Sequence, residues 1–424
     1  MNLARVRAIG GQAALFLSAF ALGKGIAFFG PLLLSQIMNI QDYGTAELSL
    51  SVGTIGAQVL SLGILGAIPQ LVLIRKEDRV QDLLFFVVTS IGVLGLTAAV
   101  VAYAASSNLL YVFAAIAIVG TGAQLTAATY YRTIGRRYRT LVSDNLSLYL
   151  FLAVGGVVFL MLGRVPLGPV VLGYGGVVLG VTIFSFIALA RTIRPHFFAA
   201  HADARRMGFF MMVNSLVYFT IVNSSRVLIG YFLSVEAVSV YSVCFRISIA
   251  IFLVHQLVGT AFYKTLYEAS AEWFDRYFVI LLAVTMVGAS VLLTTFELYG
   301  AVLLPSWAGY MDQMSGVLPI TCMQVIWWVS LALLEFRINR TLISKQATLW
   351  LVACAGLMIV ALATLSVLHL LTLATAALVF SCTLFLALQA QLFLLRRNGV
   401  PLPKTQIALF APLVFLVPAF FLQS

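Results

Sequence analysis

Charged residues are scarce in this chain of 424 residues, and acidic residues are the scarcer kind. Asp, Glu, Lys and Arg together make up 9% of the sequence, hydrophobic residues make up 62%, and the mean hydropathy is +1.07. A soluble domain of this length needs many more charged side chains to cover its surface. The composition therefore excludes a soluble globular protein and indicates a polytopic, all-α integral membrane protein.

Cysteine is also rare, and its positions match no metal-binding motif. Cys244, Cys322, Cys354 and Cys382 lie within apolar stretches at no spacing typical of metal ligands. We expect all four to be small buried side chains. The sequence predicts no metal, no cofactor and no catalytic residue.

Hydrophobic runs long enough to cross a membrane recur from one end of the chain to the other. At about 1.5 Å per residue, about 18 residues in a helix cross most of the roughly 30 Å of hydrocarbon. The twelve predicted spans are 12–38, 46–74, 83–105, 109–131, 145–162, 169–190, 208–232, 239–263, 277–304, 312–338, 348–368 and 371–395. A thirteenth segment, 405–422, contains Pro412 and Pro418; we expect a kinked span, with a shallow re-entrant segment as the alternative.

Basic residues gather in every second connection between these spans. With a cytoplasmic N-terminus, 21 of the 25 Lys and Arg residues fall on the cytoplasmic side, and one, Arg164, falls outside. Lys24, Arg226 and Arg246 lie within predicted spans. This asymmetry follows the positive-inside rule, so the net charge of +11 reflects topology and contact with lipid head groups, not nucleic-acid binding.

The chain contains a weak internal repeat. A shift of 195 positions places LSQIMNIQDYGTAEL, residues 34–48, over IGYFLSVEAVSVYSV, residues 229–243. Six helices separate the copies, so the halves have the same orientation and are related by an axis along the membrane normal. This predicts an N-lobe at 1–195, a cytoplasmic linker at 196–207, a C-lobe at 208–395 and an additional hydrophobic segment at 396–424. Two six-helix lobes of this kind should enclose a central cavity.

Several segments resemble a known family. NIQDYGTA at 39–46, SLGILGAIPQ at 61–70, SRVLIGYFLSVEAVSVYS at 225–242 and LLPSWAGYMDQMSGVLPI at 303–320 are similar to motifs of Wzx-type polysaccharide flippases for O-antigen or exopolysaccharide. The superfamily also contains MATE drug and cation antiporters and lipid II flippases. The resemblance implies two lobes that alternate access to a central site. Ser225 stands where the family pattern usually has an aspartate, and Ser239 stands where it has a glycine.

Three cations lie at predicted membrane depth, where an ionisable side chain costs roughly 2.5–3.5 kcal/mol. Arg226 and Arg246 are expected at similar depth in the outer half, and Lys24 near the middle of the first span. For the two arginines, lining of a cavity, an internal salt bridge and snorkelling to the outer interface all stay open. For Lys24, cavity lining is the expectation.

Polar side chains accompany these cations at helical spacing. Asn214, Tyr218 and Ser225 share one side of the seventh span with Arg226, which predicts a cavity-lining stripe. Glu47, at the start of the second span, is a candidate charge partner. A cationic cavity attracts anions, and a guanidinium can hold a phosphate group through two parallel hydrogen bonds.

These features predict a transporter and no enzyme. Its expected substrate is a polyprenyl-diphosphate-linked oligosaccharide, moved from the inner to the outer leaflet of a bacterial cytoplasmic membrane for surface polysaccharide synthesis. Membrane lipids and other polysaccharide assembly proteins are the expected partners. A MATE-type drug or cation antiporter, which needs a membrane-embedded carboxylate, is the first alternative. A membrane glycosyltransferase or polymerase is the second, although the predicted outer connections are too short for an active-site loop.

Overall fold

The fold is taken from a computed structural model of the chain, which describes residues 3–61, 63–69, 71–72, 80–106, 108–192, 213, 216, 224–253, 255, 269–341 and 343–417. The chain divides into two compact units, Met1–Leu216 and Val217–Ser424. The predicted lobe boundaries at 195 and 208 fall outside the described residues and stay predictions. Each unit is described by itself below.

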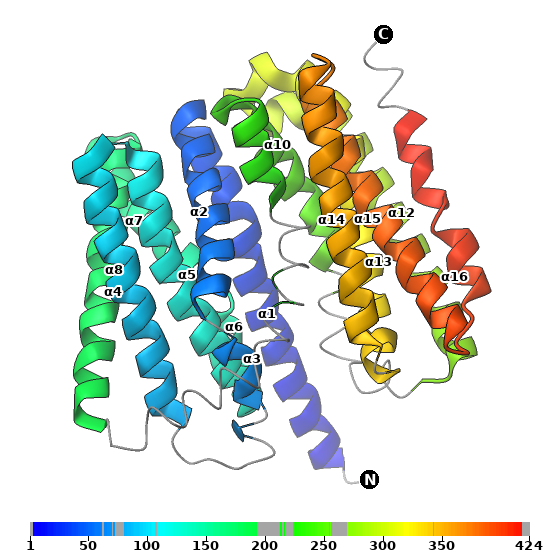
Figure 1. Ribbon diagram of the computed structural model, residues 1–424, viewed down its shortest axis with the longest axis horizontal. Helices are drawn as coiled ribbons and strands as arrows, with labels where there is room; N and C mark the ends of the chain where they lie inside the picture. The colour runs from blue at the N-terminus through cyan, green and yellow to red at the C-terminus, as the bar shows by residue number, and fades with distance from the viewer. Residues whose placement is uncertain are drawn as a thin grey trace. The chain divides into compact units, whose positions relative to one another are not determined.

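The first unit is built around one central helix (Figure 1). Its elements are α1 (Leu3–Ile37), α2 (Ile40–Leu60), α3 (Ile64–Pro69), α4 (Val80–Ser106), α5 (Leu109–Thr133), α6 (Arg137–Ser143), α7 (Leu146–Leu162) and α8 (Leu167–Thr192). Helix α5 packs against α2, α3, α4, α6, α7 and α8. Its most apolar stretch is 61% buried, the highest share among the spans of this unit.

The second unit repeats this plan around α13. Its elements are α10 (Val235–Ser248), η2 (Ile249–Ile251), α12 (Ala271–Leu303), η3 (Pro305–Tyr310), α13 (Met311–Arg340), α14 (Ser344–Val367), α15 (Leu373–Arg397), α16 (Pro403–Ala408) and η4 (Ala411–Phe415). Helix α13 packs against α10, α12, α14, α15 and η4. The candidate span Pro305–Glu335, which covers most of α13, is 89% buried in its most apolar stretch, so α13 is the core of this unit.

The membrane class is confirmed. Among the described residues, eight helices are long and apolar enough to cross a membrane, and α7 is a shorter apolar helix at the predicted fifth span. The protein is therefore an all-α, multi-pass membrane protein. Predicted spans 208–232 and 239–263 fall partly outside the described residues, so their full extent stays a prediction.

The predicted second span, 46–74, is wrong as a continuous helix. Helix α2 begins earlier, at Ile40, and ends at Leu60; Gly63 then has a φ of 82°, a left-handed conformation that interrupts the helix. The short helix α3 follows. Hydropathy missed the break because the segment stays apolar across it.

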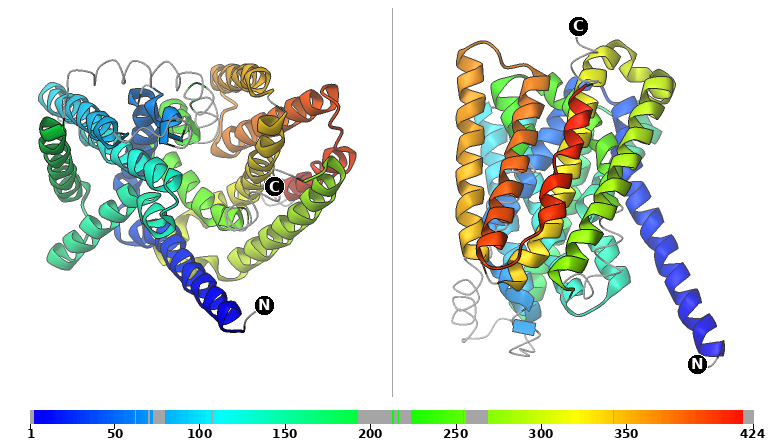
Figure 2. Two further views of the ribbon diagram at one scale, coloured as in Figure 1. Left: turned by 90° about the horizontal axis from the view of Figure 1, so that it is seen from below. Right: turned by 90° about the vertical axis from the view of Figure 1, so that its right-hand side faces the viewer.

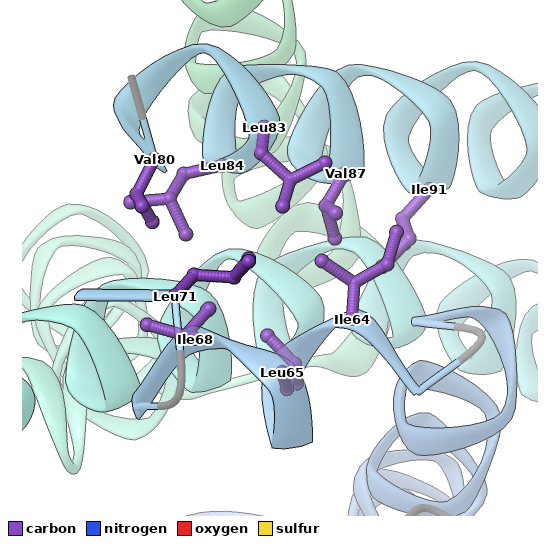
Figure 3. Packing of buried hydrophobic residues seen from close by; sticks show 9 residues of the cluster. All are labelled: Ile64, Leu65, Ile68, Leu71, Val80, Leu83, Leu84, Val87 and Ile91. Atoms are coloured by element: carbon purple, nitrogen blue, oxygen red, sulfur yellow. The ribbon is translucent and has the colours of Figure 1, made fainter. Parts of the chain in front are cut away.

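Helix α3 is held in place by a hydrophobic cluster with the start of α4 (Figure 3). The cluster consists of Ile64, Leu65, Ile68, Leu71, Val80, Leu83, Leu84, Val87 and Ile91. Its side chains point toward one another from the two segments, as Figure 3 shows. The break after α2 thus turns the apolar residues of 64–71 inward, onto α4, instead of toward lipid.

Small residues allow close helix packing around α5. A Cβ atom at Gly53 of α2 would lie 2.7 Å from the Cβ atom of Ala117. At Gly95 of α4, a Cβ atom would lie 3.0 Å from the Ala115 carbonyl oxygen. Membrane helices have no hydrophobic force between them, so such close contact is a main source of their association.

Two helix starts reproduce the internal repeat. Asn39 caps α2, its side chain accepting a hydrogen bond from Asp42 N, and Ser234, 195 positions later, caps α10 by accepting from Ala237 N. Both caps have extended backbone conformations. The correspondence expected between 34–48 and 229–243 is therefore present in the local structure.

The C-terminal segment packs along the second unit. Helix α16 packs against α12, and η4 packs against α13 (Figure 2). Pro412 lies in the first turn of η4. The buried Asp275 carboxylate accepts hydrogen bonds from Thr405 N and Thr405 Oγ1 at 2.8 and 2.7 Å, and from Lys404 N at 3.1 Å. Trp327 Nε1 donates to the Leu409 carbonyl at 3.1 Å. The segment is helical with a change of helix type near Pro412, and its last residues fall outside the description.

The cysteine prediction needs one correction. Cys244, Cys322 and Cys354 are buried, but Cys382 is exposed on α15. An apolar span has a lipid-facing side, and hydropathy does not show on which side a small residue falls.

Candidate functional site

Arg226 lies in the interior of the second unit. Its side chain is 6% exposed and is held against α10 by two contacts. The guanidinium Nε donates a hydrogen bond to Ser242 Oγ at 3.0 Å, and its central carbon lies 4.8 Å from the centre of the Phe245 ring. A hydrogen bond and a cation–π contact together fix the orientation of the guanidinium plane.

Arg246 follows Ser242 by four residues, one turn of α10. Side chains at positions i and i+4 lie on the same face of a helix, so Arg246 lies on the face of α10 that carries Ser242. Because Ser242 binds the Arg226 guanidinium, the two arginines are associated with neighbouring positions on that face. Arg246 is partly exposed, whereas Ser242 is fully buried. The similar depth expected for the two arginines stays a prediction.

A buried polar layer surrounds Ser242. The adjacent Tyr241 is fully buried and donates a hydrogen bond from its hydroxyl to Gln324 Oε1 at 2.9 Å. One turn or more further along α10, the Ser248 and Thr321 hydroxyl groups lie 2.8 Å apart. These bonds connect α10 to the central helix α13, and they give Arg226 a polar surrounding inside an apolar bundle.

An aromatic series continues from Arg226 toward His255. The Phe245 ring stacks with Trp328 at 6.1 Å, Trp328 stacks with Phe252 at 4.2 Å, and Phe252 lies 5.3 Å from the His255 ring. Trp328 and Phe252 are half-buried, and His255 is 8% exposed. The series therefore leads from the buried Phe245 ring beside the guanidinium to the partly accessible rings of Trp328 and Phe252, and such rings can stack on planar or ring-shaped ligands.

Lys24 lies in α1, which packs in parallel with α7. Gly30 lies against Leu152, and Leu34 lies against Gly155. This register places Lys24 level with the first turn of α7. The depth of Lys24 in the membrane stays a prediction.

The surroundings of Lys24 are polar. The carbonyl of the preceding residue, Gly23, accepts a hydrogen bond from Tyr149 OH at 2.9 Å. Asp144, which attracts Lys24, is in an ion pair with Arg132 at 2.8 Å. Within the described part of the chain Lys24 forms no ion pair, with Glu47 or with any other residue.

Glu47 is buried in α2, with 4% of its surface exposed. It lies 195 positions before Ser242, so the repeat places a carboxylate in the first unit where the second unit has the hydroxyl that binds Arg226. The two units thus differ in charge at equivalent positions of the same fold.

The other predicted site residues divide into two groups. Ser225 is fully buried, and its hydroxyl has no hydrogen-bond partner among the described residues. Asn214 and Tyr218 fall outside the described residues, so the predicted stripe on the seventh span stays a prediction. The contacts of Ser242 and Phe245 with Arg226 could not be predicted from the sequence, because contacts between helices leave no periodic signal along one helix.

No group of His, Cys, Asp and Glu side chains within the described ranges is arranged to bind a metal ion.

Comparisons with known proteins locate the fold. No protein-family model matches the chain, and no curated protein matches it by sequence. Among solved structures, the chain is similar to one described as the inward-facing conformation of a multidrug resistance MATE family transporter of the MOP superfamily. The two chains are 13% identical, the TM-score is 0.50, and the match covers 93% of this chain and 95% of the other.

This likeness concerns the fold. It extends over nearly the whole of both chains, 93% of this one and 95% of the other. The expected fold class is confirmed.

Proposed function

We propose that the protein flips a polyprenyl-diphosphate-linked oligosaccharide across a bacterial cytoplasmic membrane by alternating access, for surface polysaccharide synthesis. The transporter fold supports movement of a substrate across the membrane. The polar head of the lipid is bound at Arg226 and Arg246, and its polyprenyl tail stays in the bilayer. No bond is made or broken.

One observation carries the choice of an anionic substrate, namely the pair of arginines on neighbouring positions of the second unit. Arg226 is oriented by Ser242 and Phe245, and Arg246 follows one turn along α10. A diphosphate offers two anionic groups to two guanidinium groups, and charge-assisted hydrogen bonds are the strongest kind that side chains form. The half-buried rings of Trp328 and Phe252 provide surfaces on which a sugar ring can stack.

The direct test measures the leaflet on which the lipid-linked oligosaccharide accumulates when the protein is depleted. Accumulation in the cytoplasmic leaflet supports flipping. An unchanged distribution, with altered tolerance to cationic drugs, refutes flipping and supports the alternative below.

Substitutions of Arg226 separate an anion-binding role from a packing role. Loss of one charge-assisted hydrogen bond costs about 1.5–3 kcal/mol, so Arg226→Met should lower export by about 10- to 100-fold at equal protein level. Arg226→Lys keeps the charge and should retain more export. Ser242→Ala is the control, because it removes the hydrogen bond at 3.0 Å and leaves the charge. Equal export by Arg226→Met and the unaltered protein would refute the anion site. Arg246→Ala should also lower export.

A drug or cation antiporter is the second candidate, favoured by the buried carboxylate of Glu47. Carboxylates within a membrane are the usual sites of proton and cation exchange. If this candidate is correct, Glu47→Gln should abolish a proton-driven drug efflux while Arg226→Met leaves it unchanged. The flippase proposal expects the reverse order of effects.

We propose further that the N-terminus is cytoplasmic, with membrane lipids and polysaccharide assembly proteins as partners. The distribution of basic residues supports this orientation. Reporter fusions after Arg164 and after Arg397 test this orientation, because the first should report the outer side of the membrane and the second the cytoplasmic side.

A further inference from the structure

A hollow of about 330 Å³ lies between α14 and α15, at the end of both helices that carries basic residues. Its walls come from the first turns of α14 and the last turns of α15. The lining residues are Gln346, Leu349, Trp350, Leu394, Arg397 and Asn398. The hollow belongs to the second unit alone and is separate from the Arg226 region.

The hollow combines a positive charge with an aromatic ring and amide groups. Arg397 is exposed and makes no ion pair or hydrogen bond through its side chain within the described part of the chain. No acidic residue lines the hollow, and Lys345 and Arg396 flank it. The Asn398 side-chain nitrogen donates to the Leu394 carbonyl at 2.8 Å, which fixes the amide at the rim. The hollow therefore has a net positive lining and attracts an anion.

The apolar part of the lining is largely exposed. Leu349 is 65% exposed and Trp350 is 47% exposed, while Leu394 forms the buried floor. Only 22% of the apolar stretch of α14 is buried, so this helix lies at the edge of its unit. Tryptophan is typical of the head-group level of a membrane, and basic residues near a helix end attract anionic lipids.

We propose that this hollow binds the phosphate head group of an anionic phospholipid. Arg397 holds the phosphate, Trp350 packs beside the glycerol region, and the acyl chains run along the exposed face of α14 that begins at Leu349. Ligand sites commonly have volumes of about 300–1,000 Å³, so the hollow is large enough for a head group and too small for an entire lipid. The site is independent of the transported substrate.

The test compares lipid retention by single variants. The purified protein is placed in nanodiscs of equal parts phosphatidylglycerol and phosphatidylcholine, and native mass spectrometry counts the lipids that remain bound after detergent washing. Arg397→Gln should lower the retention of phosphatidylglycerol about fivefold, the effect of one basic residue on an anionic lipid. Arg397→Lys should retain most of it. Arg396→Gln is the matched control, because it removes the same charge from the next position outside the hollow.

Each outcome decides the proposal. Loss of phosphatidylglycerol in Arg397→Gln, with normal retention in Arg396→Gln and no change for phosphatidylcholine, supports the site. Equal loss in both variants would show diffuse surface attraction and overturn it. Binding of inorganic phosphate that depends on Arg397, without retained lipid, would also overturn the lipid assignment. Trp350→Ala gives an independent variant, which should lower retention without any change of charge.

Discussion

Asp275 in the first turns of α12 should control the attachment of the C-terminal segment. Its carboxylate is 4% exposed and accepts three hydrogen bonds from Lys404 and Thr405 at the start of α16. Asp275→Ala removes both acceptor oxygens, and with them all three hydrogen bonds, and leaves two backbone N–H groups without their partner. At about 0.6–1.5 kcal/mol for each hydrogen bond, the attachment loses about 2–4 kcal/mol.

The peptide bond between Lys404 and Thr405 provides the assay, because trypsin cleaves after lysine. Cleavage needs local opening of the segment, and its rate follows the open fraction when reclosing is fast. A loss of about 2–4 kcal/mol should raise the cleavage rate about 30- to 1,000-fold, as followed by mass spectrometry of the released peptide. Thr405→Val removes one bond of the three and should have a smaller effect.

Glu272→Gln is the matched control. Glu272 lies in the first turn of α12, before Asp275, but it is exposed and pairs with Arg276 at 2.7 Å. Its removal should therefore change the cleavage rate by less than about fivefold. Cleavage of Asp275→Ala at the rate of the unaltered protein would refute the reasoning. So would equal acceleration by Glu272→Gln, because the effect would then come from surface charge.

Two further predictions concern packing in the first unit. Gly53→Ala places a Cβ atom 2.7 Å from that of Ala117, and overpacking of this kind costs about 1–3 kcal/mol, so the melting temperature in detergent should fall. Gly25→Ala is the control, because its Cβ atom meets nothing within 4 Å, and it should leave the melting temperature unchanged. Equal melting temperatures for both variants would contradict the prediction. Tyr174→Phe removes the buried hydrogen bond to Ser147 and should cost about 1–3 kcal/mol of stability with transport per molecule unchanged; a fall in transport at normal stability would show that this bond belongs to the substrate site.

Helix positions were largely predictable because they follow from interactions between residues that are close along the chain. A run of apolar residues must satisfy its backbone hydrogen bonds internally in lipid, so the predicted spans 83–105 and 109–131 appear as α4 and α5. The failure at 46–74 has a local cause as well. Gly63 permits a left-handed turn, and the apolar residues after it pack on α4, which hydropathy does not distinguish from insertion into lipid.

The candidate site was predictable only in part. Arg226 and Arg246 stand out because a charge within an apolar run is costly. Their environment needed the packing of α10 on α13, which brings Phe245 to Trp328 and Tyr241 to Gln324. The level of Lys24 relative to α7 needed the register of α1 against α7.

The sequence by itself determined the membrane class, most helix positions, the asymmetry of basic residues and the correspondence of two helix starts 195 positions apart. These depend on composition and on interactions between residues close along the chain. Only the tertiary structure decided that Ser242 and Phe245 orient Arg226, that Asp275 holds Thr405, and that α14 and α15 form a cationic hollow at Arg397. Each of these contacts joins side chains from different helices, and their pairing is fixed by how the helices pack against one another.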